Sequence, residues 1–273
     1  MKRFVIKLAA VLVAIAMVIL PVSVAIDPYN VFHYMNPRDN GVEANKGFIK
    51  TKYMIKNHDR FDSLVFGSSR AGFVDVLYLN EKTGNKFYNM ASSESLVSEQ
   101  TRELRVLIKS GFVPKKVWVF VDDISCFVDP LLHENMLYRV PYPLGLFETA
   151  EFYLKYVDLI TVYNSCKVIN DYKEKVLNEG KSLDEYTFDK AYENGYADYL
   201  YALSDITDYY NFSGHTYVSK DYQYYYETSH YMPQVSRLMI DAVLGNGDNG
   251  NDELFGMHVT KDNKDILIER LTE

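Results

Sequence analysis

The chain begins with an apolar run that is long enough to cross a membrane. Residues 8–26 (LAAVLVAIAMVILPVSVAI) carry no charge, and three basic side chains stand in residues 1–7 (MKRFVIK). A run of about 19 apolar residues spans a hydrocarbon core of roughly 30 Å, and basic flanks stay on the cytoplasmic side. We therefore predict an uncleaved signal anchor, a transmembrane helix, over residues 1–26, with everything after Asp27 outside the cytoplasm. A cleaved signal peptide is the alternative, because Ser23-Val24-Ala25 has the small-x-small pattern of a cleavage site.

Beyond this run, short apolar segments alternate with a segment of helical periodicity. Residues 62–67 (DSLVFG), 86–90 (KFYNM) and 117–121 (VWVFV) favour strands buried in a sheet. Residues 95–110 carry apolar side chains at helical spacing and end at Gly111, a helix C-cap signal. The order strand, helix, strand predicts a parallel α/β sheet.

The distribution of polar and apolar residues divides the rest of the chain into a stalk and a folded domain. Residues 27–60 are polar, with scattered Pro and Gly, and predict an irregular stalk leading into one folded domain over residues 61–273. From Pro143 to about residue 206 the pattern is helical, and residues 157–169 are a candidate strand with a helix as the alternative. Further elements are expected near the C-terminus: a strand at 209–212, a helix at 232–244, an exposed loop at 245–251, and a helix at 261–271 with Thr260 as N-cap.

Composition narrows the function classes. The 273 residues include 29 Lys plus Arg and 37 Asp plus Glu, which gives a formal net charge of −8. Nucleic-acid-binding domains usually carry net positive charge or a basic stripe, so nucleic acid is not an expected partner. The 24 Tyr suit partly exposed surfaces, either through ordinary packing or through contacts with carbohydrate.

The cysteines and histidines do not indicate a metal or cofactor. Cys126 and Cys166 permit one disulfide outside the cell, and two buried thiols are the alternative. The six His are scattered without metal-ligand spacing, and the sequence has no phosphate-binding loop of the P-loop type. We therefore predict neither a metal nor a cofactor.

Two short blocks combine residue types that carry nucleophilic chemistry. The first, residues 66–70 (FGSSR), follows the first predicted strand, where ligands bind in open α/β sheets. A serine there can expose its hydroxyl and place its backbone N–H near a developing oxyanion; a plain turn is the alternative. In the second block, residues 226–231 (YETSHY), Glu227 can orient the ring of His230 while the other ring nitrogen takes a proton. A surface Glu and a helix-start His are the alternative there.

Together the blocks resemble the SGNH/GDSL hydrolase superfamily, where a nucleophilic Ser follows the first strand and an acid-x-x-His lies near the C-terminus. The resemblance covers roughly residues 61–244 and implies Ser69 as nucleophile, His230 as general base and Glu227 as orienting acid. Gly67-Ser68-Ser69 is similar to the block of a membrane-anchored bacterial cell-surface branch, which includes the D-alanyl transfer protein of teichoic acid synthesis. The implied α/β fold has three α/β/α layers around a mostly parallel sheet, which could be shortened here.

The sequence departs from the family pattern in three blocks. The acid is Glu227 rather than Asp, and residues 89–93 (NMASS) lack the usual oxyanion Gly, so Asn89 or backbone N–H groups would take that role. The third strand ends in Asp122 where the family has an Asn donor, and an ionised carboxylate cannot donate a hydrogen bond. Arg70, directly after the proposed nucleophile, would bind an anionic substrate group or else lie on a helix surface.

The resemblance implies an extracytoplasmic serine esterase or O-acyltransferase that acts on acyl groups of a cell-envelope glycan or polymer. The expected partners are the membrane, that polymer and a membrane-embedded acyltransferase. A degenerate SGNH-like domain that binds glycan or scaffolds an envelope assembly is the alternative, because the usual oxyanion residues are missing. The choice between hydrolysis and transfer stays open, because the shape of the pocket selects the acceptor.

Overall fold

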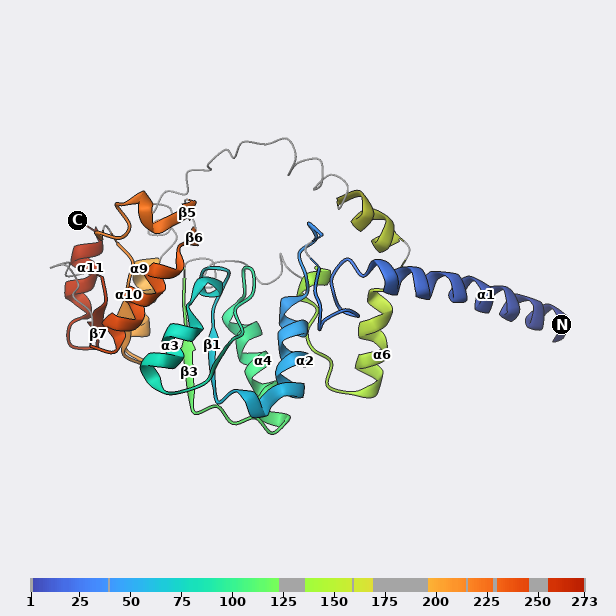
Figure 1. Cartoon of the computed structure of the whole chain (residues 1–273), viewed down its shortest axis with the longest axis horizontal. Coiled ribbons are helices and arrows are strands. Elements are labelled where there is room, and N and C mark those ends of the chain that lie inside the picture. The colour runs from blue at the N-terminus through green and yellow to red at the C-terminus, as the bar shows by residue number, and fades with distance from the viewer. Residues whose placement is uncertain are drawn as a thin grey trace. The chain divides into compact units, whose positions relative to one another are not determined.

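A computed structural model divides the chain into two compact units (Figure 1). The first unit comprises residues 1–58, 101–112 and 130–181, and the second comprises residues 59–100, 113–129 and 182–273. The structure describes residues 2–38, 40–122, 136–158, 160–168, 196–214, 216–227, 230–245 and 255–272.

The first unit begins with α1 (Lys2–Ile26), a helix of 25 residues whose apolar side chains are largely exposed. Among the described residues it is the one helix long and apolar enough to cross a membrane. The predicted N-terminal apolar helix is therefore confirmed in length and composition. A signal sequence has the same properties, so the anchor and the cleaved leader stay as alternatives.

One buried carboxylate orders the segment that follows α1. Asp27 is 2% exposed, and its side-chain oxygens accept hydrogen bonds from the backbone N–H groups of Val31, Phe32 and His33 at 2.7–2.9 Å. Asp27 and Asn30 both adopt positive φ, 39° and 57°, which turns the chain sharply. The residues directly after α1 are thereby held in a compact loop.

Residues 46–57 correct the expectation of an irregular stalk over residues 27–60. They form α2 (Lys46–Asn57), which is followed by the short 3-10 helix η1 (His58–Arg60). The lysines of α2 make the segment polar overall and mask the helical spacing of Phe48, Ile49 and Met54, which are buried. Polarity alone therefore gave the wrong expectation for this stretch.

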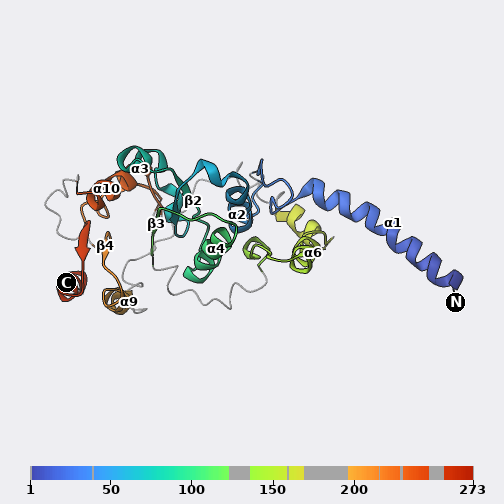
Figure 2. The same ribbon diagram turned by 90° about the horizontal axis from the view of Figure 1, so that it is seen from below.

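Three further elements complete the first unit (Figure 2). They are η4 (Leu137–Arg139), α6 (Leu146–Lys155) and a helical segment over residues 160–168. The last of these shows that residues 157–169, the candidate strand, contain the alternative, a helix. With α2 and the loop after α1, they surround a core rich in aromatic side chains, whose buried members are Val31, Phe48, Ile49, Phe152 and Tyr156.

Asn45 is the polar centre of this core. It is 1% exposed, and its Oδ1 accepts from the backbone N–H of Phe48 at 3.0 Å, which caps α2. Its Nδ2 donates to the carbonyl of Val140 and to the hydroxyl of Tyr156, both at 2.8 Å, and to the carbonyl of Leu137 at 3.3 Å. One amide thus joins the start of α2 to two later segments of the chain.

The second unit is built on a three-stranded parallel sheet within the described residues. β1 (Ser63–Phe66) lies between β2 (Phe87–Asn89) and β3 (Lys116–Val119). All four residues of β1 are buried, as expected for a strand covered on both faces. The three predicted strands and their parallel pairing are confirmed, and the fold is mixed α/β.

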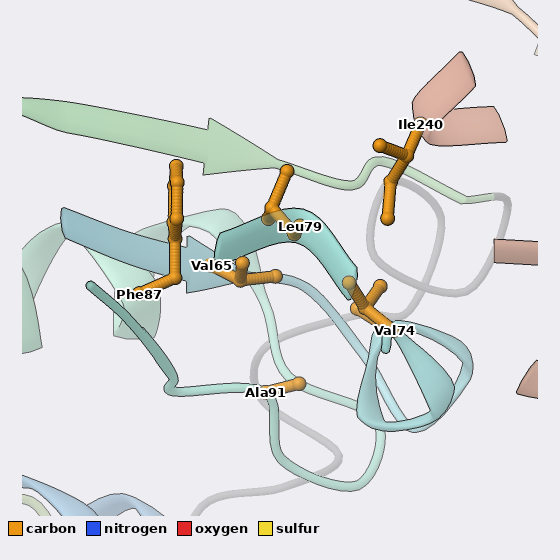
Figure 3. Packing of buried hydrophobic residues seen from close by; sticks show 7 residues of the cluster. Val65, Val74, Leu79, Phe87, Ala91 and Ile240 are labelled. Carbon is orange, nitrogen blue, oxygen red and sulfur yellow. The ribbon is translucent and has the colours of Figure 1, made fainter. Parts of the chain in front are cut away.

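Two helices contribute to the main core of this unit. They are α3 (Val76–Thr83) and α10 (Pro233–Val243), the latter confirming the helix predicted at 232–244. Figure 3 shows side chains from β1, β2, α3 and α10 converging, and the buried members of the cluster are Val65, Ala71, Val74, Leu79, Phe87, Ala91 and Ile240. α4 (Val97–Lys109), which belongs to the first unit from residue 101 onward, and the left-handed Gly111 after it (φ 95°) confirm the helix predicted at 95–110.

The C-terminal part forms a second small sheet. β4 (Tyr209–Asn211) confirms the strand predicted at 209–212, but it pairs antiparallel with β7 (Met257–Val259) and does not join the parallel sheet. α9 (Tyr196–Leu203) and α11 (Lys264–Thr272) pack on this pair. Because α11 begins at Lys264, Thr260 is not its N-cap, and the expected start at residue 261 is wrong.

Some of the expectations concern residues that lie outside the described ranges. Cys126 and the loop over residues 246–251 are among them. Cys166 is partly buried on the helical segment of the first unit. The disulfide that the sequence permits and its alternative, two buried thiols, therefore both stay open.

The contacts of Asn45 generate a stability prediction. We expect Asn45→Ala to lower the free energy of unfolding by about 2 to 4 kcal/mol, because it removes a helix cap and strands buried acceptors. Asn45→Asp preserves the capping oxygen for Phe48 but turns a carboxylate toward the carbonyls of Leu137 and Val140. Chemical denaturation should find Asp at least as destabilising as Ala; a neutral Asp variant would mean that capping alone matters.

Candidate functional site

The carboxyl ends of the three parallel strands bring separate segments of the chain together. In the sheet register, Val65 of β1 lies opposite Asn89 of β2, and Phe66 lies opposite Val119 of β3. The residues directly after β1 and β3 therefore leave the sheet at the same edge, where ligands bind in open α/β sheets.

Gly67 makes the turn after β1 possible. A Cβ at this position would lie 2.5 Å from the Cβ of Ala71 and 2.9 Å from the Cβ of Phe120, both closer than packed carbons approach. Its φ of +154° also disfavours other residues. The chain then enters the 3-10 helix η2 (Arg70–Phe73), and Ser69 occupies its N-cap position.

The structure brings Ser69 and His230 together from positions 161 residues apart. The hydroxyl Oγ of Ser69 lies 3.0 Å from Nε2 of His230, within the range for a nucleophile and its base. His230 belongs to β6 (His230–Tyr231), which pairs antiparallel with β5 (Tyr225–Glu227) after the 3-10 helix η5 (Tyr222–Tyr224). When the imidazole proton is on Nδ1, Nε2 can accept the serine proton.

Glu227 is placed only by its backbone, which pairs with His230 across the two strands. The location of its carboxylate lies outside the described part of the structure. Its role as the orienting acid stays a prediction.

Aromatic packing holds His230 against the turn that carries Ser69. The ring of Phe73, at the end of η2, lies 5.4 Å from the His230 ring and 5.4 Å from the Tyr226 ring. Phe73 follows Ser69 by four residues, so the same short helix carries the proposed nucleophile and a side chain that packs on its proposed base.

A polar contact joins the start of α3 to α10, the helix that follows His230. The carboxylate of Asp75 accepts from the backbone N–H of Tyr78, which caps α3, and from Nε and Nη2 of Arg237 at 2.8 and 2.7 Å. The hydroxyl of Ser236 accepts from the backbone N–H of Asp75 at 2.9 Å. Because α10 begins three residues after His230, these contacts limit where His230 can lie.

Asp122 connects both neighbours of Ser69 to the end of β3. Ser68 is 1% exposed, and its hydroxyl donates to Oδ2 of Asp122. The guanidinium of Arg70 lies 3.7 Å from the same oxygen. Sequence reasoning treated Asp122 only as a missing oxyanion donor, although a carboxylate ending the strand beside a Gly-Ser-Ser turn was a usable signal for such a contact.

Asn89 contacts the proposed nucleophile turn through its side chain. Its Nδ2 donates to the carbonyl of Ala71 at 2.8 Å, and its Oδ1 accepts from the backbone N–H of Ala91 at 2.9 Å. These bonds hold η2 against the end of β2. The oxyanion role expected for Asn89 stays a prediction, and any such donation must come from the second amide hydrogen.

Arg70 lies near two tyrosines as well as Asp122. Burial raises the pKa of Tyr225 and of Tyr231, and the nearby Arg70 guanidinium partly opposes both shifts. The Tyr231 hydroxyl is buried and has no hydrogen-bond partner among the described residues. The Arg70 side chain is itself partly buried. Its contact with Asp122 offsets its positive charge.

Comparisons with known proteins give no relative for this chain. No protein-family model matches it, and neither a curated protein nor a solved structure matches it. Within the described ranges, no group of three or more His, Cys, Asp or Glu is arranged to hold a metal ion.

The contact between Ser68 and Asp122 can be tested through a double-mutant cycle. Ser68→Ala and Asp122→Ala should each lower the free energy of unfolding by about 1 to 3 kcal/mol, because each leaves a polar group without its partner. The double variant should be less destabilised than the sum, by a coupling energy of about 0.5 to 3 kcal/mol. The control pair is Ser68→Ala with Asp205→Ala, because the Asp205 carboxylate pairs with Lys264 and not with Ser68. Denaturant titration should find the effects of these two substitutions additive.

The contacts of Asp75 predict how the stability of the protein changes at acidic pH. The backbone N–H of Tyr78 and the guanidinium of Arg237 hold the pKa of Asp75 below its ordinary value of 3.8. A lowered folded pKa contributes stability above the unfolded value, and this is lost as pH falls below about 3.8. Asp75→Asn retains a cap for α3, so we expect a loss under about 1 kcal/mol at neutral pH.

That loss should shrink toward zero as thermal unfolding is followed from about pH 7 to about pH 3. Arg237→Gln should show the same dependence on pH, because it removes the other half of the contact. A loss for Asp75→Asn that is independent of pH would contradict the assignment.

Proposed function

We propose that this protein is a membrane-anchored, extracytoplasmic serine esterase or O-acyltransferase that acts on acyl groups of a cell-envelope glycan or polymer. The observation that carries the proposal is the 3.0 Å approach of Ser69 Oγ to His230 Nε2. Two further features support it: the turn geometry that Gly67 permits and the position of Ser69 at the carboxyl end of a buried parallel strand.

The proposed reaction proceeds in two steps. Ser69 Oγ attacks the acyl carbonyl while His230 takes the hydroxyl proton, and His230 then returns that proton to the departing alcohol. In the second step His230 takes a proton from water or from a sugar hydroxyl as its oxygen attacks the acyl-serine carbonyl. The bond to Ser69 Oγ then breaks, and His230 returns the proton to that oxygen, which restores the free serine. Water gives an esterase and a sugar gives a transferase. Glu227 would hold the imidazole and stabilise its charged form.

Backbone groups are the best candidates for stabilising the oxyanion. The first N–H groups of a helical turn lack partners within that turn, and η2 begins directly after Ser69. Asn89 is a second candidate through its amide. Asp122 is unsuitable while ionised, because a carboxylate only accepts hydrogen bonds.

Exposed aromatic surface supports a sugar-containing substrate. Tyr226 is 55% exposed and its ring packs on Phe73, which also contacts His230. An aromatic ring with a polar hydroxyl suits contact with a glycan face. We further propose the SGNH-like three-layer arrangement and, from that resemblance, a membrane-embedded acyltransferase as partner.

The proposed location follows from α1. Its apolar length fits a bilayer, and its basic N-terminal residues favour retention on the cytoplasmic side, which would put the residues after α1 outside the cytoplasm.

One observation favours a second candidate function, a degenerate SGNH-like domain that binds glycan or scaffolds an envelope assembly. Asp122 stands where the family has an Asn donor, and it contacts Ser68 and Arg70 instead of offering a hydrogen to an oxyanion. Reactivity of Ser69 decides between the two candidates.

A serine-reactive fluorophosphonate probe tests the proposal. We expect labelling of the intact protein at Ser69, located by peptide mapping, and its loss in Ser69→Ala. His230→Ala should slow labelling by about 10² to 10⁴-fold, because the hydroxyl then lacks its general base. Added imidazole should restore part of the rate in His230→Ala but none in Ser69→Ala.

Two outcomes would support the degenerate domain instead. One is the absence of labelling in a protein whose circular dichroism shows a folded state. The other is equal labelling of wild type and His230→Ala, which would mean that His230 does not activate the serine.

A further inference from the structure

α6 carries a second apolar face that no described part of the chain covers. Leu146 and Phe147 are 91% and 93% exposed, and Leu154 is 65% exposed. With Ala150 they form a stripe at spacing i, i+1, i+4 and i+8, which lies along one side of a helix. The opposite side of the same helix buries Phe152 in the core of the first unit.

The two glutamates of α6 have partners on α6 or directly before it. Glu148 accepts a hydrogen bond from the backbone N–H of Leu144 at 2.8 Å, and Glu151 pairs with Lys155 at 3.3 Å. The stripe itself is apolar, and the charged side chains of α6, which are two Glu and one Lys, leave one net negative charge beside it. Such a surface favours an apolar medium over a charged partner.

Direct contacts fix α6 close to the end of α1. Tyr29 and Phe32, which follow α1 by three and six residues, pack on Tyr156 and Tyr153 with ring centroids 5.8 and 5.6 Å apart. Figure 1 and Figure 2 both show α6 beside the C-terminal end of α1 and running across its direction. If α1 spans a bilayer, α6 lies along the bilayer surface.

A second helical segment of the first unit also exposes apolar and aromatic side chains. Within residues 160–168 of the first unit, Ile160 is 70% exposed and Tyr163 is 73% exposed. Tyrosine is enriched where an apolar ring meets the lipid headgroups.

We propose that the stripe of Leu146, Phe147, Ala150 and Leu154 docks into the outer surface of the bilayer that α1 spans, at the boundary of headgroups and acyl chains. This rests on the proposed membrane anchoring and adds a second attachment to it. Lipid is favoured over another protein because the anchor itself places α6 at the bilayer. The docking holds the first unit against the membrane and prevents it from turning freely about the end of α1.

The stripe docks through apolar contact, because α6 lacks the basic face that binds anionic headgroups. Attachment of α6 should therefore be insensitive to salt between about 0.05 and 0.5 M and to the fraction of anionic lipid.

Tryptophan fluorescence in vesicles tests the docking. The full chain carrying Phe147→Trp is reconstituted in phosphatidylcholine–phosphatidylglycerol vesicles, and the emission of the single native Trp118 is subtracted using the parent protein. Because Phe147 is 93% exposed, the substitution leaves the fold intact. We expect a blue shift and an about twofold or greater loss of the added emission with lipids brominated near the headgroup.

The matched control is Ile108→Trp on α4, a 47% exposed residue of the same unit, with α2 between α4 and α6 (Figure 1). It should show neither the shift nor the quenching.

Flotation of the vesicles separates the possible failures. Protein that floats with the vesicles while the tryptophan at position 147 is unquenched overturns the docking and leaves the anchor standing. A blue shift without quenching overturns it also, since a second copy or another protein then covers the stripe. Protein that does not float overturns the anchor and the docking together, whereas labelling of Ser69 tests the enzymatic proposal independently.

Discussion

The close approach of the chain at Gly67 is the constraint on which the site depends. Only a residue without Cβ fits between Ala71 and Phe120, and this fit lets the chain turn from β1 into η2 within three residues. The turn places Ser69 at the edge of the sheet, and Asp122 then contacts both of its neighbours, Ser68 and Arg70. Backbone sterics therefore set the position of Ser69, and one carboxylate from the adjacent strand limits its movement.

His230 reaches the same edge through apolar packing rather than chain proximity. Ile240 of α10 is fully buried with Val65 of β1, so burial of one side chain brings a late segment of the chain onto the parallel sheet (Figure 3). Apolar packing is non-directional and does not orient an imidazole. The ring of Phe73 packs on His230, and the pairing of Asp75 with Arg237 ties α10 to the start of α3. Both contacts contribute to the position of the imidazole.

Local pattern was enough to predict the strands of the parallel sheet, which are compact apolar runs, and α10, whose apolar side chains recur at helical spacing. The proximity of Ser69 and His230 was inferred from resemblance and not from periodicity. Pairing between distant segments was harder to predict. β4 was predicted as a strand, but its antiparallel partner β7 has only three residues, too few for a clear strand pattern. α2 was missed because the lysines of an amphipathic helix outweigh its buried Phe48 and Met54 in a reading by polarity.

The charge distribution at the site bears on the kind of substrate. Arg70 and Asp122 lie 3.7 Å apart and largely cancel, so an anionic group would have to displace Asp122 to gain the full charge of Arg70. That displacement would also break the contact of Asp122 with Ser68 and loosen the turn. A neutral acyl ester avoids this cost. For the proposed esterase or acyltransferase activity, selection would then fall to the shape of the site and to the exposed ring of Tyr226, an aromatic surface that suits an uncharged sugar.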